Sequence, residues 1–155
     1  MLPRTYDNQV CPVARALETV GDRWTMLIVR DVMLGFHRFD DFQKHLGIAR
    51  NTLTDRLSRL VEEGILERRL YQERPERYEY RLTRKGVDLW PTMVSLLKWG
   101  DRYLAPDGPP RVLRHRDCGG EPDDHLTCTE CGTRLWAWDV VAERGPGASP
   151  REVLP

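Results

Sequence analysis

Apolar residues recur every three or four positions over the first part of the chain, and this spacing predicts a series of short helices. Pro12 favours a helix start, because its missing N–H is not needed there, and that helix should end at Gly21. Asp22 can cap a second, almost wholly apolar helix that ends at Gly35. A third helix should stop at Gly47.

The next segment, LGIARNTLTDRLSRLVEEG at residues 46–64, predicts a fourth helix with two different faces. Its leucines Leu53, Leu57 and Leu60 lie at helical spacing, so one face should pack inward before Gly64 stops the helix. The opposite face is polar and consists of Asn51, Thr52, Asp55, Ser58, Arg59 and Glu62, with Arg50 and Arg56 on its flanks. The candidates for DNA contact on this helix are Arg50, Asn51, Thr52, Asp55, Arg56 and Arg59.

After Gly64 the pattern changes to the alternation typical of strands. ILERRLYQ and RYEYRLT predict a hairpin whose charged turn carries Pro75 at its tip, between Arg74 and Arg77. Thr83 should cap a last helix from about residue 84 to 103, bent at Pro91. Its broad apolar stripe is too long for a small core, which indicates a partner surface.

Two helices joined by a tight turn and followed by a hairpin are the layout of a winged helix-turn-helix, in which the second helix enters the major groove of double-stranded DNA. The polar face of the fourth helix, Arg50 to Arg59, would then meet bases and phosphates, and Arg74 and Arg77 would reach the flanking backbone or the minor groove. Two alternatives remain: a merely solvated face, or a winged helix that binds protein rather than sequence-specific DNA.

The segments CPVARALETVGDRWTMLIVRDVM, RFDDFQKHLGIARNTLTDRLSRLVEEGIL and YEYRLTRKG, taken together, resemble the HxlR family of winged-helix transcriptional regulators, which is similar to the MarR group. The resemblance covers about residues 8–104. It implies a homodimer, formed through the first and last helices, that binds promoter operators. One departure is Ala49, where the family pattern has Ser or Thr; without that capping hydroxyl the helix start should be weaker by about 1 kcal/mol unless Asn51 caps it.

Charge and hydropathy restrict the other possibilities. The net charge is zero, but residues 1–104 hold 18 Lys and Arg against 15 Asp and Glu, so DNA binding must rest on a local basic surface. No apolar run is long enough to cross a membrane and no secretory signal is recognisable, so we expect a cytoplasmic protein. No arrangement of catalytic residues is evident, and we expect no enzyme activity.

The four cysteines fall into two groups. Cys11 lies just before a predicted helix start, where the helix dipole favours a thiolate. Several HxlR regulators sense oxidants or electrophiles with a cysteine at this place, so the resemblance makes Cys11 a redox-sensing candidate. The alternative is a small apolar residue in the dimer seam.

The other three cysteines form two knuckles, HRDCGG and CTECGT, in which His115 and Cys118, and then Cys128 and Cys131, are three residues apart. This is zinc-ribbon spacing, and two such turns can close a structural Zn²⁺ site. Asp117 or His125 are alternative ligands to His115, and an oxidisable cysteine cluster without metal is the rival interpretation. We therefore predict a mainly α, α+β fold with a winged-helix domain at 1–104, a zinc-ribbon-like β module at 105–142 and a disordered tail at 143–155.

Overall fold

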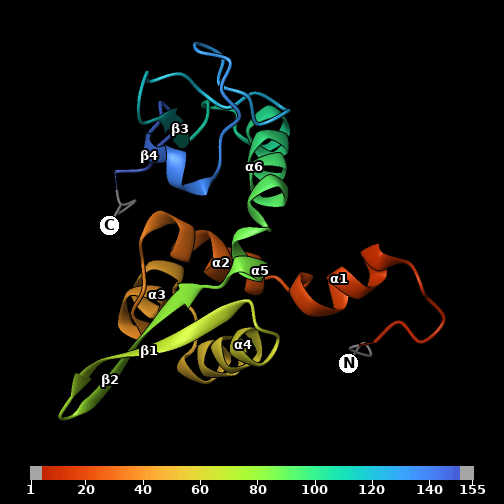
Figure 1. The fold of residues 1–155 in the computed structure, drawn as a ribbon, viewed down its shortest axis with the longest axis vertical. Coiled ribbons are helices and arrows are strands. Elements are labelled where there is room, and N and C mark those ends of the chain that lie inside the picture. The colour runs from red at the N-terminus through yellow and green to blue at the C-terminus, as the bar shows by residue number, and fades with distance from the viewer. Residues whose placement is uncertain (1–4, 151–155) are drawn as a thin grey trace. The chain divides into compact units, whose positions relative to one another are not determined.

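The computed structural model describes residues 5–150, so residues 151–155 of the predicted tail lie outside the described residues. The chain forms two compact units that divide between Gly86 and Val87. The first contains α1 (Pro12–Val20), α2 (Thr25–Leu34), α3 (Phe39–Leu46), α4 (Arg50–Glu62), β1 (Leu66–Glu73) and β2 (Glu76–Leu82), and α5 (Arg84–Val87) spans the division (Figure 1). No helix among the described residues is long and apolar enough to cross a membrane.

The core of the first unit forms where α2, α3 and α4 meet. Ile28, Val29, Phe42 and Leu53 are completely buried there, and Leu57 is 1% exposed. Close packing of these apolar side chains is the main source of stability for helices this short. The turn between α3 and α4 passes through Gly47, whose φ of +62° is easily adopted only by glycine. The predicted helix-turn-helix is therefore confirmed.

The hairpin of β1 and β2 forms the wing of this unit. The strands pair antiparallel from Leu66 opposite Leu82 to Glu73 opposite Glu76, and the register shifts between Leu70 and Gln72. An isolated bridge between Arg38 and Glu79 joins the segment before α3 to the sheet. The tip of the hairpin projects beyond the helices of its unit (Figure 1).

The second unit contains α6 (Trp90–Leu104), β3 (Arg111–His115), the 3₁₀ turn η1 (Ala137–Asp139) and β4 (Val140–Arg144). The strands β3 and β4 pair antiparallel, with Arg111 opposite Arg144 and His115 opposite Val140. Trp90 and Leu135 are buried in this unit, and the Trp90 indole N–H donates to the Leu135 carbonyl at 3.4 Å.

Three features of the chain from residue 84 onward differ from the sequence-based expectation. The long helix predicted from residue 84 is divided: α5 ends at Val87, and α6 begins at Trp90 with Pro91 in its first turn, where an N–H is not required. The division at Gly86 also groups α6 with the Cys-containing module. The last strand continues to Arg144 because residues 143 and 144 pair with β3.

Candidate DNA-binding surface and metal centre

The start of α4 presents the predicted base-reading residues to solvent. Arg50, Asn51 and Asp55 are exposed and Thr52 is half-buried, while the Arg50 guanidinium lies 4.8 Å above the Phe39 ring. Ala49 occupies the N-cap with extended backbone, and no side-chain hydrogen bond caps the helix. The N–H groups of its first turn therefore remain available to an anionic group such as a phosphate.

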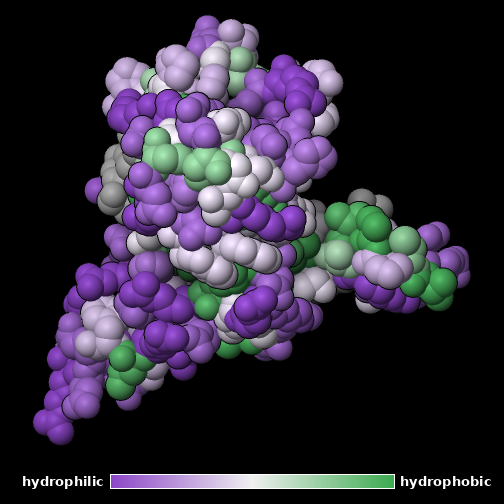
Figure 2. Space-filling view, turned by 45° about the horizontal axis from the view of Figure 1, so that its top comes forward, coloured by the Kyte–Doolittle hydropathy of each residue, from purple (hydrophilic) through white to green (hydrophobic). Residues whose placement is uncertain are grey.

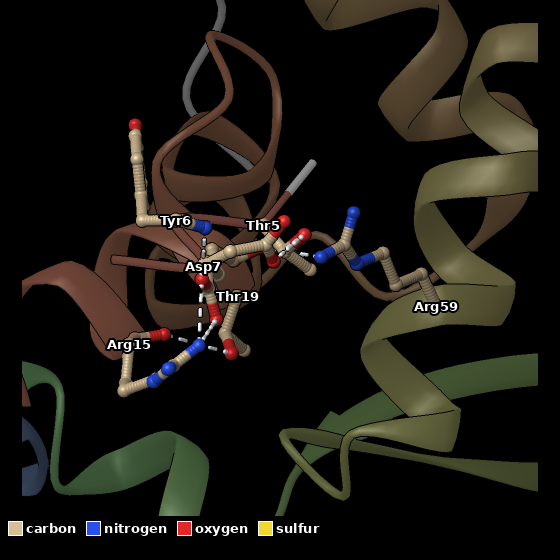
Figure 3. Close-up of polar contacts among 7 residues, drawn as sticks. Thr5, Tyr6, Asp7, Arg15, Thr19 and Arg59 are labelled. Atoms are coloured by element: carbon tan, nitrogen blue, oxygen red, sulfur yellow. Dashed lines mark hydrogen bonds and ion pairs between the residues drawn. The ribbon is translucent and has the colours of Figure 1, made fainter. Parts of the chain in front are cut away.

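The other two predicted arginines of α4 point toward the protein. Arg56 Nε donates to the Asp22 carboxylate at 3.0 Å, and the Arg59 guanidinium donates to the backbone carbonyl of Glu18. Figure 3 shows Arg59 extending from α4 toward the end of α1. Both side chains are half-buried. They differ in this from Arg50, which lies on the same helix but is exposed.

The N-terminal segment and α1 carry the predicted redox residue. Cys11 is exposed and occupies the N-cap of α1, and its carbonyl accepts a hydrogen bond from the Arg15 N–H at 3.2 Å. The Glu18 carboxylate accepts from the Tyr6 N–H at 2.5 Å and from Arg15 at 2.9 Å. Figure 3 shows Tyr6 and Arg15 on the same side of this segment. The two hydrogen bonds hold the pKa of Glu18 below its ordinary value.

The wing carries its candidate contacts at the tip. Arg74 and Arg77 are exposed, and in the part of the chain that the structure describes neither forms an ion pair. Further along the hairpin, the Arg68 guanidinium lies 4.0 Å above the Tyr78 ring, whose hydroxyl donates to Glu76 at 2.9 Å. Both tip arginines are thus cations without a carboxylate partner among the residues that the structure describes.

The four predicted metal ligands come together in the second unit. The ligand atoms of His115, Cys118, Cys128 and Cys131 all lie within 4.8 Å of one another. Cys118 Sγ lies 3.2 Å from His115 Nδ1 and 3.4 Å from Cys128 Sγ, and Cys131 Sγ lies 3.4 Å from His115 Nδ1. A tetrahedral zinc ion with bonds of about 2.3 Å to sulfur requires ligand separations of about 3.5–3.8 Å. The cluster is therefore close to the size that such an ion needs.

Glycines shape both knuckles of the cluster. Gly119 and Gly132 have φ of +76° and +72°, and their N–H groups bond to the carbonyls of His115 and Cys128 at 2.8 and 3.0 Å. These equivalent turns place each pair of ligands on one side of the site. At Gly120 a Cβ atom would lie only 2.4 Å from Cys128 Sγ, so the backbone approaches the cluster where no side chain fits.

The surroundings of the cluster suit a bound cation. Asp117 Oδ2 lies 3.6 Å from His115 Nε2, while Nδ1 of the same imidazole faces the cysteines. The cluster includes neither Asp117 nor His125. The side chain and backbone of Thr133 lower the pKa of Cys131 to about 6. The backbone hydrogen bond with Gly120 lowers the pKa of Cys118, but the hydrogen bond with Cys128 raises it more, to about 11.

Two helices leave apolar side chains exposed. In α1 no residue is buried, and Val13 and Leu17 are 65% and 50% exposed. Figure 2 shows hydrophobic residues gathered over this helix. In α6 the exposed apolar residues are Leu96, Trp99, Tyr103 and Leu104, and the rings of Trp99 and Tyr103 lie 5.5 Å apart. Apolar faces of this kind are typical of surfaces that a partner covers.

Comparison with known proteins identifies the family. The family model for the HxlR-like helix-turn-helix matches residues 19–108, more than half of the chain. The chain belongs to the HxlR-like helix-turn-helix family. The expected family and the mainly α winged helix-turn-helix fold are thereby confirmed.

Relatives of this HxlR-like chain extend the comparison beyond the winged helix. An HTH-type transcriptional regulator of Mycobacterium tuberculosis is 51% identical over 136 residues, which cover 87% of this chain and 86% of its own. A match of that extent necessarily includes the Cys/His cluster. The crystal structure of PA1607, described as a candidate transcription factor, has a TM-score of 0.69 at 42% identity and covers 89% of this chain and 97% of its own.

A third likeness is to a protein named for redox regulation. The redox regulator HypR in its oxidised form is 31% identical, with a TM-score of 0.56, and covers 59% of this HxlR-like chain and 96% of its own. The family and the names of the relatives indicate a transcription regulator.

Proposed function

We propose that this HxlR-like protein is a transcriptional regulator that binds operator DNA as a homodimer, with the N-terminal half of α4 in the major groove. The observation that carries the proposal is the buried leucine face of α4 opposite an exposed, uncapped polar start. A helix anchored in this way can present side chains and backbone N–H groups to DNA without moving.

The contacts of the described side chains support a division of roles. Arg50, Asn51, Thr52 and Asp55 are proposed to meet base edges and phosphates, because they surround the open first turn of α4. Asn51 makes no capping bond there and is therefore available as a base reader. Arg74 and Arg77 are proposed to neutralise phosphates beside the groove, because neither pairs with a carboxylate of residues 5–150.

The homodimer is proposed to cover the apolar faces of α1 and α6. Two-fold symmetric dimers bury the same surface on both copies, and each of these helices leaves large apolar side chains exposed in a single chain. A dimer also presents two α4 helices, which matches an inverted-repeat operator with half-sites one helical turn apart.

The Cys/His cluster is proposed to bind structural Zn²⁺, and Cys11 to be an oxidant-sensitive thiol. The donor set of three cysteines and one histidine is one that zinc prefers, and it leaves no ligand position open for catalysis. The ion would stabilise the fold of a module whose hydrophobic core is small. The proposal for Cys11 is supported by its exposure and by the likeness to HypR.

The DNA-binding proposal is tested by gel shift with the DNA upstream of the protein's own gene, at several salt concentrations. We expect a saturable complex that resists non-specific competitor, and each of Arg74→Gln and Arg77→Gln should lower the slope of log affinity against log salt by about 0.9. Ser58→Ala, an exposed change on the far part of α4, is the matched control. A chain that binds no DNA even at low salt, or whose binding ignores salt, would favour the protein-interaction alternative.

The zinc proposal is tested by metal analysis of protein purified without chelator. About one equivalent per chain is expected, and less than about a tenth would exclude the site. For Cys11, operator release by diamide should be lost in Cys11→Ser, and unchanged release would show that sensing does not depend on this thiol.

A further inference from the structure

The connection between α1 and α2 is a tight junction fastened by Asp22. A Cβ at Gly21 would lie 2.4 Å from the Leu17 carbonyl oxygen, so the chain can turn this closely only with glycine. The Asp22 carboxylate accepts from the N–H groups of Trp24 and Thr25 at 2.9 and 3.2 Å and also from the Thr25 hydroxyl. Asp22 thereby satisfies N–H groups at the start of α2 from two residues before the N-cap position, which Trp24 occupies.

Arg56 of α4 donates a further hydrogen bond to the Asp22 carboxylate. Arg56 Nε donates to the same Asp22 oxygen that accepts the two backbone N–H groups, at 3.0 Å. The two side chains are only 24% and 28% exposed, so solvent screens the pair less than it would a surface ion pair. Burial opposes ionisation of Asp22, but the hydrogen bonds and the charge of Arg56 keep its pKa below the ordinary value.

The second arginine closes the end of α1. The last carbonyls of a helix have no partner within the helix, and α1 has no basic residue in its last turn. Arg59 supplies the missing cation from α4, because its guanidinium donates to the Glu18 carbonyl. A cation at a helix C-terminus also interacts favourably with the helix dipole.

Arg56 and Arg59 lie three residues apart on one flank of α4, so both can reach the junction at once. Because no residue of α1 is buried, polar contacts such as these matter for holding that helix. We infer that Arg56 and Arg59 are positioning residues that clamp the recognition helix to the α1–α2 junction, so that the position of α1 sets the orientation of α4 toward DNA. The inference rests on the proposed function, in which α1 is part of the dimer surface and α4 reads the operator.

This assignment separates the arginines of α4 into two kinds. Arg50 is exposed at the open end of the helix and serves as a direct DNA contact. Arg56 and Arg59 act on DNA affinity without neutralising a phosphate, because their guanidinium groups are engaged by Asp22 and Glu18. A change in the position of α1 would thereby be passed to α4.

The test is a double-mutant cycle with the full-length protein, combining Asp22→Asn and Arg56→Gln. Each single variant should lower operator affinity about five- to tenfold, and the double variant should be no weaker than the worse single one, since both remove the same contact. The salt slope should stay at the wild-type value in both. Arg50→Gln, the matched control, should lower that slope by about 0.9.

A second measurement isolates the link to α1. Amide hydrogen exchange in α1 should become faster in Arg59→Gln than in wild type, whereas Arg50→Gln should leave it unchanged. Urea unfolding of every variant shows whether the chain remains folded under the binding conditions.

Two results would overturn the inference. The first is that Asp22→Asn and Arg56→Gln have additive effects on operator affinity. The second is that Arg56→Gln lowers the salt slope by about 0.9 while Asp22→Asn leaves operator affinity unchanged. If the wild-type protein binds no DNA, the proposed function fails on its own. The clamp is then judged by the same cycle in urea unfolding, where non-additive effects support it and additive effects refute it.

Discussion

Replacing Gly120 with alanine tests whether the Cys/His cluster is a metal site whose geometry the backbone imposes. The new Cβ would lie 2.4 Å from Cys128 Sγ and 2.8 Å from the Cγ atom of Glu130. Nonbonded carbon and sulfur atoms need a separation of at least about 3.5 Å, so Sγ or the backbone must move by about 1 Å. Cys128 is 2% exposed and has little room to relax.

A displacement of that size is large for a metal ligand, because ligand distances in such sites hold to within about 0.2 Å. We therefore expect Gly120→Ala to weaken Zn²⁺ binding about 10- to 100-fold, equivalent to about 1.4–2.7 kcal/mol. The assay is competition with a chromophoric chelator. A Co²⁺-substituted sample reports in parallel on the number of thiolate ligands through its absorption spectrum.

Gly132→Ala is the matched control, because Gly132 lies in the equivalent turn but has no neighbouring atom within 4 Å of a Cβ. Its φ of +72° makes alanine unfavourable by about 1–2 kcal/mol, so binding weakens through backbone strain while the Co²⁺ spectrum stays that of the wild type. In Gly120→Ala the spectrum should change as well. Wild-type affinity and spectrum in Gly120→Ala would refute the reasoning.

Three other changes give distinct expectations. Leu57→Ala should destabilise the chain by about 3 kcal/mol in urea unfolding, because the side chain is 1% exposed between helices, whereas the exposed Ser58→Ala should stay within about 0.5 kcal/mol. The pKa of Asp22 is lowered in the folded state, so the stability that its carboxylate contributes is complete above the unfolded value of 3.8 and is lost as the pH falls through the folded pKa. The difference in unfolding free energy between wild type and Asp22→Asn should therefore shrink on acidification. A difference that stays constant with pH would contradict this. Trp99→Glu should shift the proposed dimer to monomer in sedimentation, since the ring is 55% exposed on α6, while Ser95→Glu should have a smaller effect.

The sequence predicts well those features that depend on neighbouring residues. The spacing of Leu53, Leu57 and Leu60 defines one face of α4, and the structure buries all three. The two knuckles are also local, because a ligand pair three residues apart with a following glycine forms its own turn. That both knuckles contribute ligands to one site is a long-range prediction, and it follows from the zinc-ribbon spacing of the cysteines.

The roles of Arg56 and Arg59 could not be predicted in the same way. A helical wheel places them on the flank of the polar face, but whether they meet water, DNA or protein depends on where the α1–α2 junction lies in space. Asp22 was predicted as a helix cap, yet nothing in its sequence position indicates that it also pairs with a residue 34 positions later. The break between α5 and α6 was missed for a similar reason, since Pro91 is compatible with a bent helix and with a new helix start.

The placement of α6 gives the metal module a role distinct from that of α4. Within the second unit, Trp90 of α6 is buried and donates to the Leu135 carbonyl, and Leu135 lies four residues after Cys131 of the second knuckle. Arg102 and Asp124 add an ion pair at 3.4 Å, but both are more than half exposed, so it contributes little. Burial of Trp90 and Leu135 is therefore the stronger of these two connections between the knuckles and α6. Because α6 also carries the exposed Trp99 and Tyr103, a metal that orders the knuckles would support the helix proposed for dimer formation and would affect DNA binding through assembly rather than through base contacts.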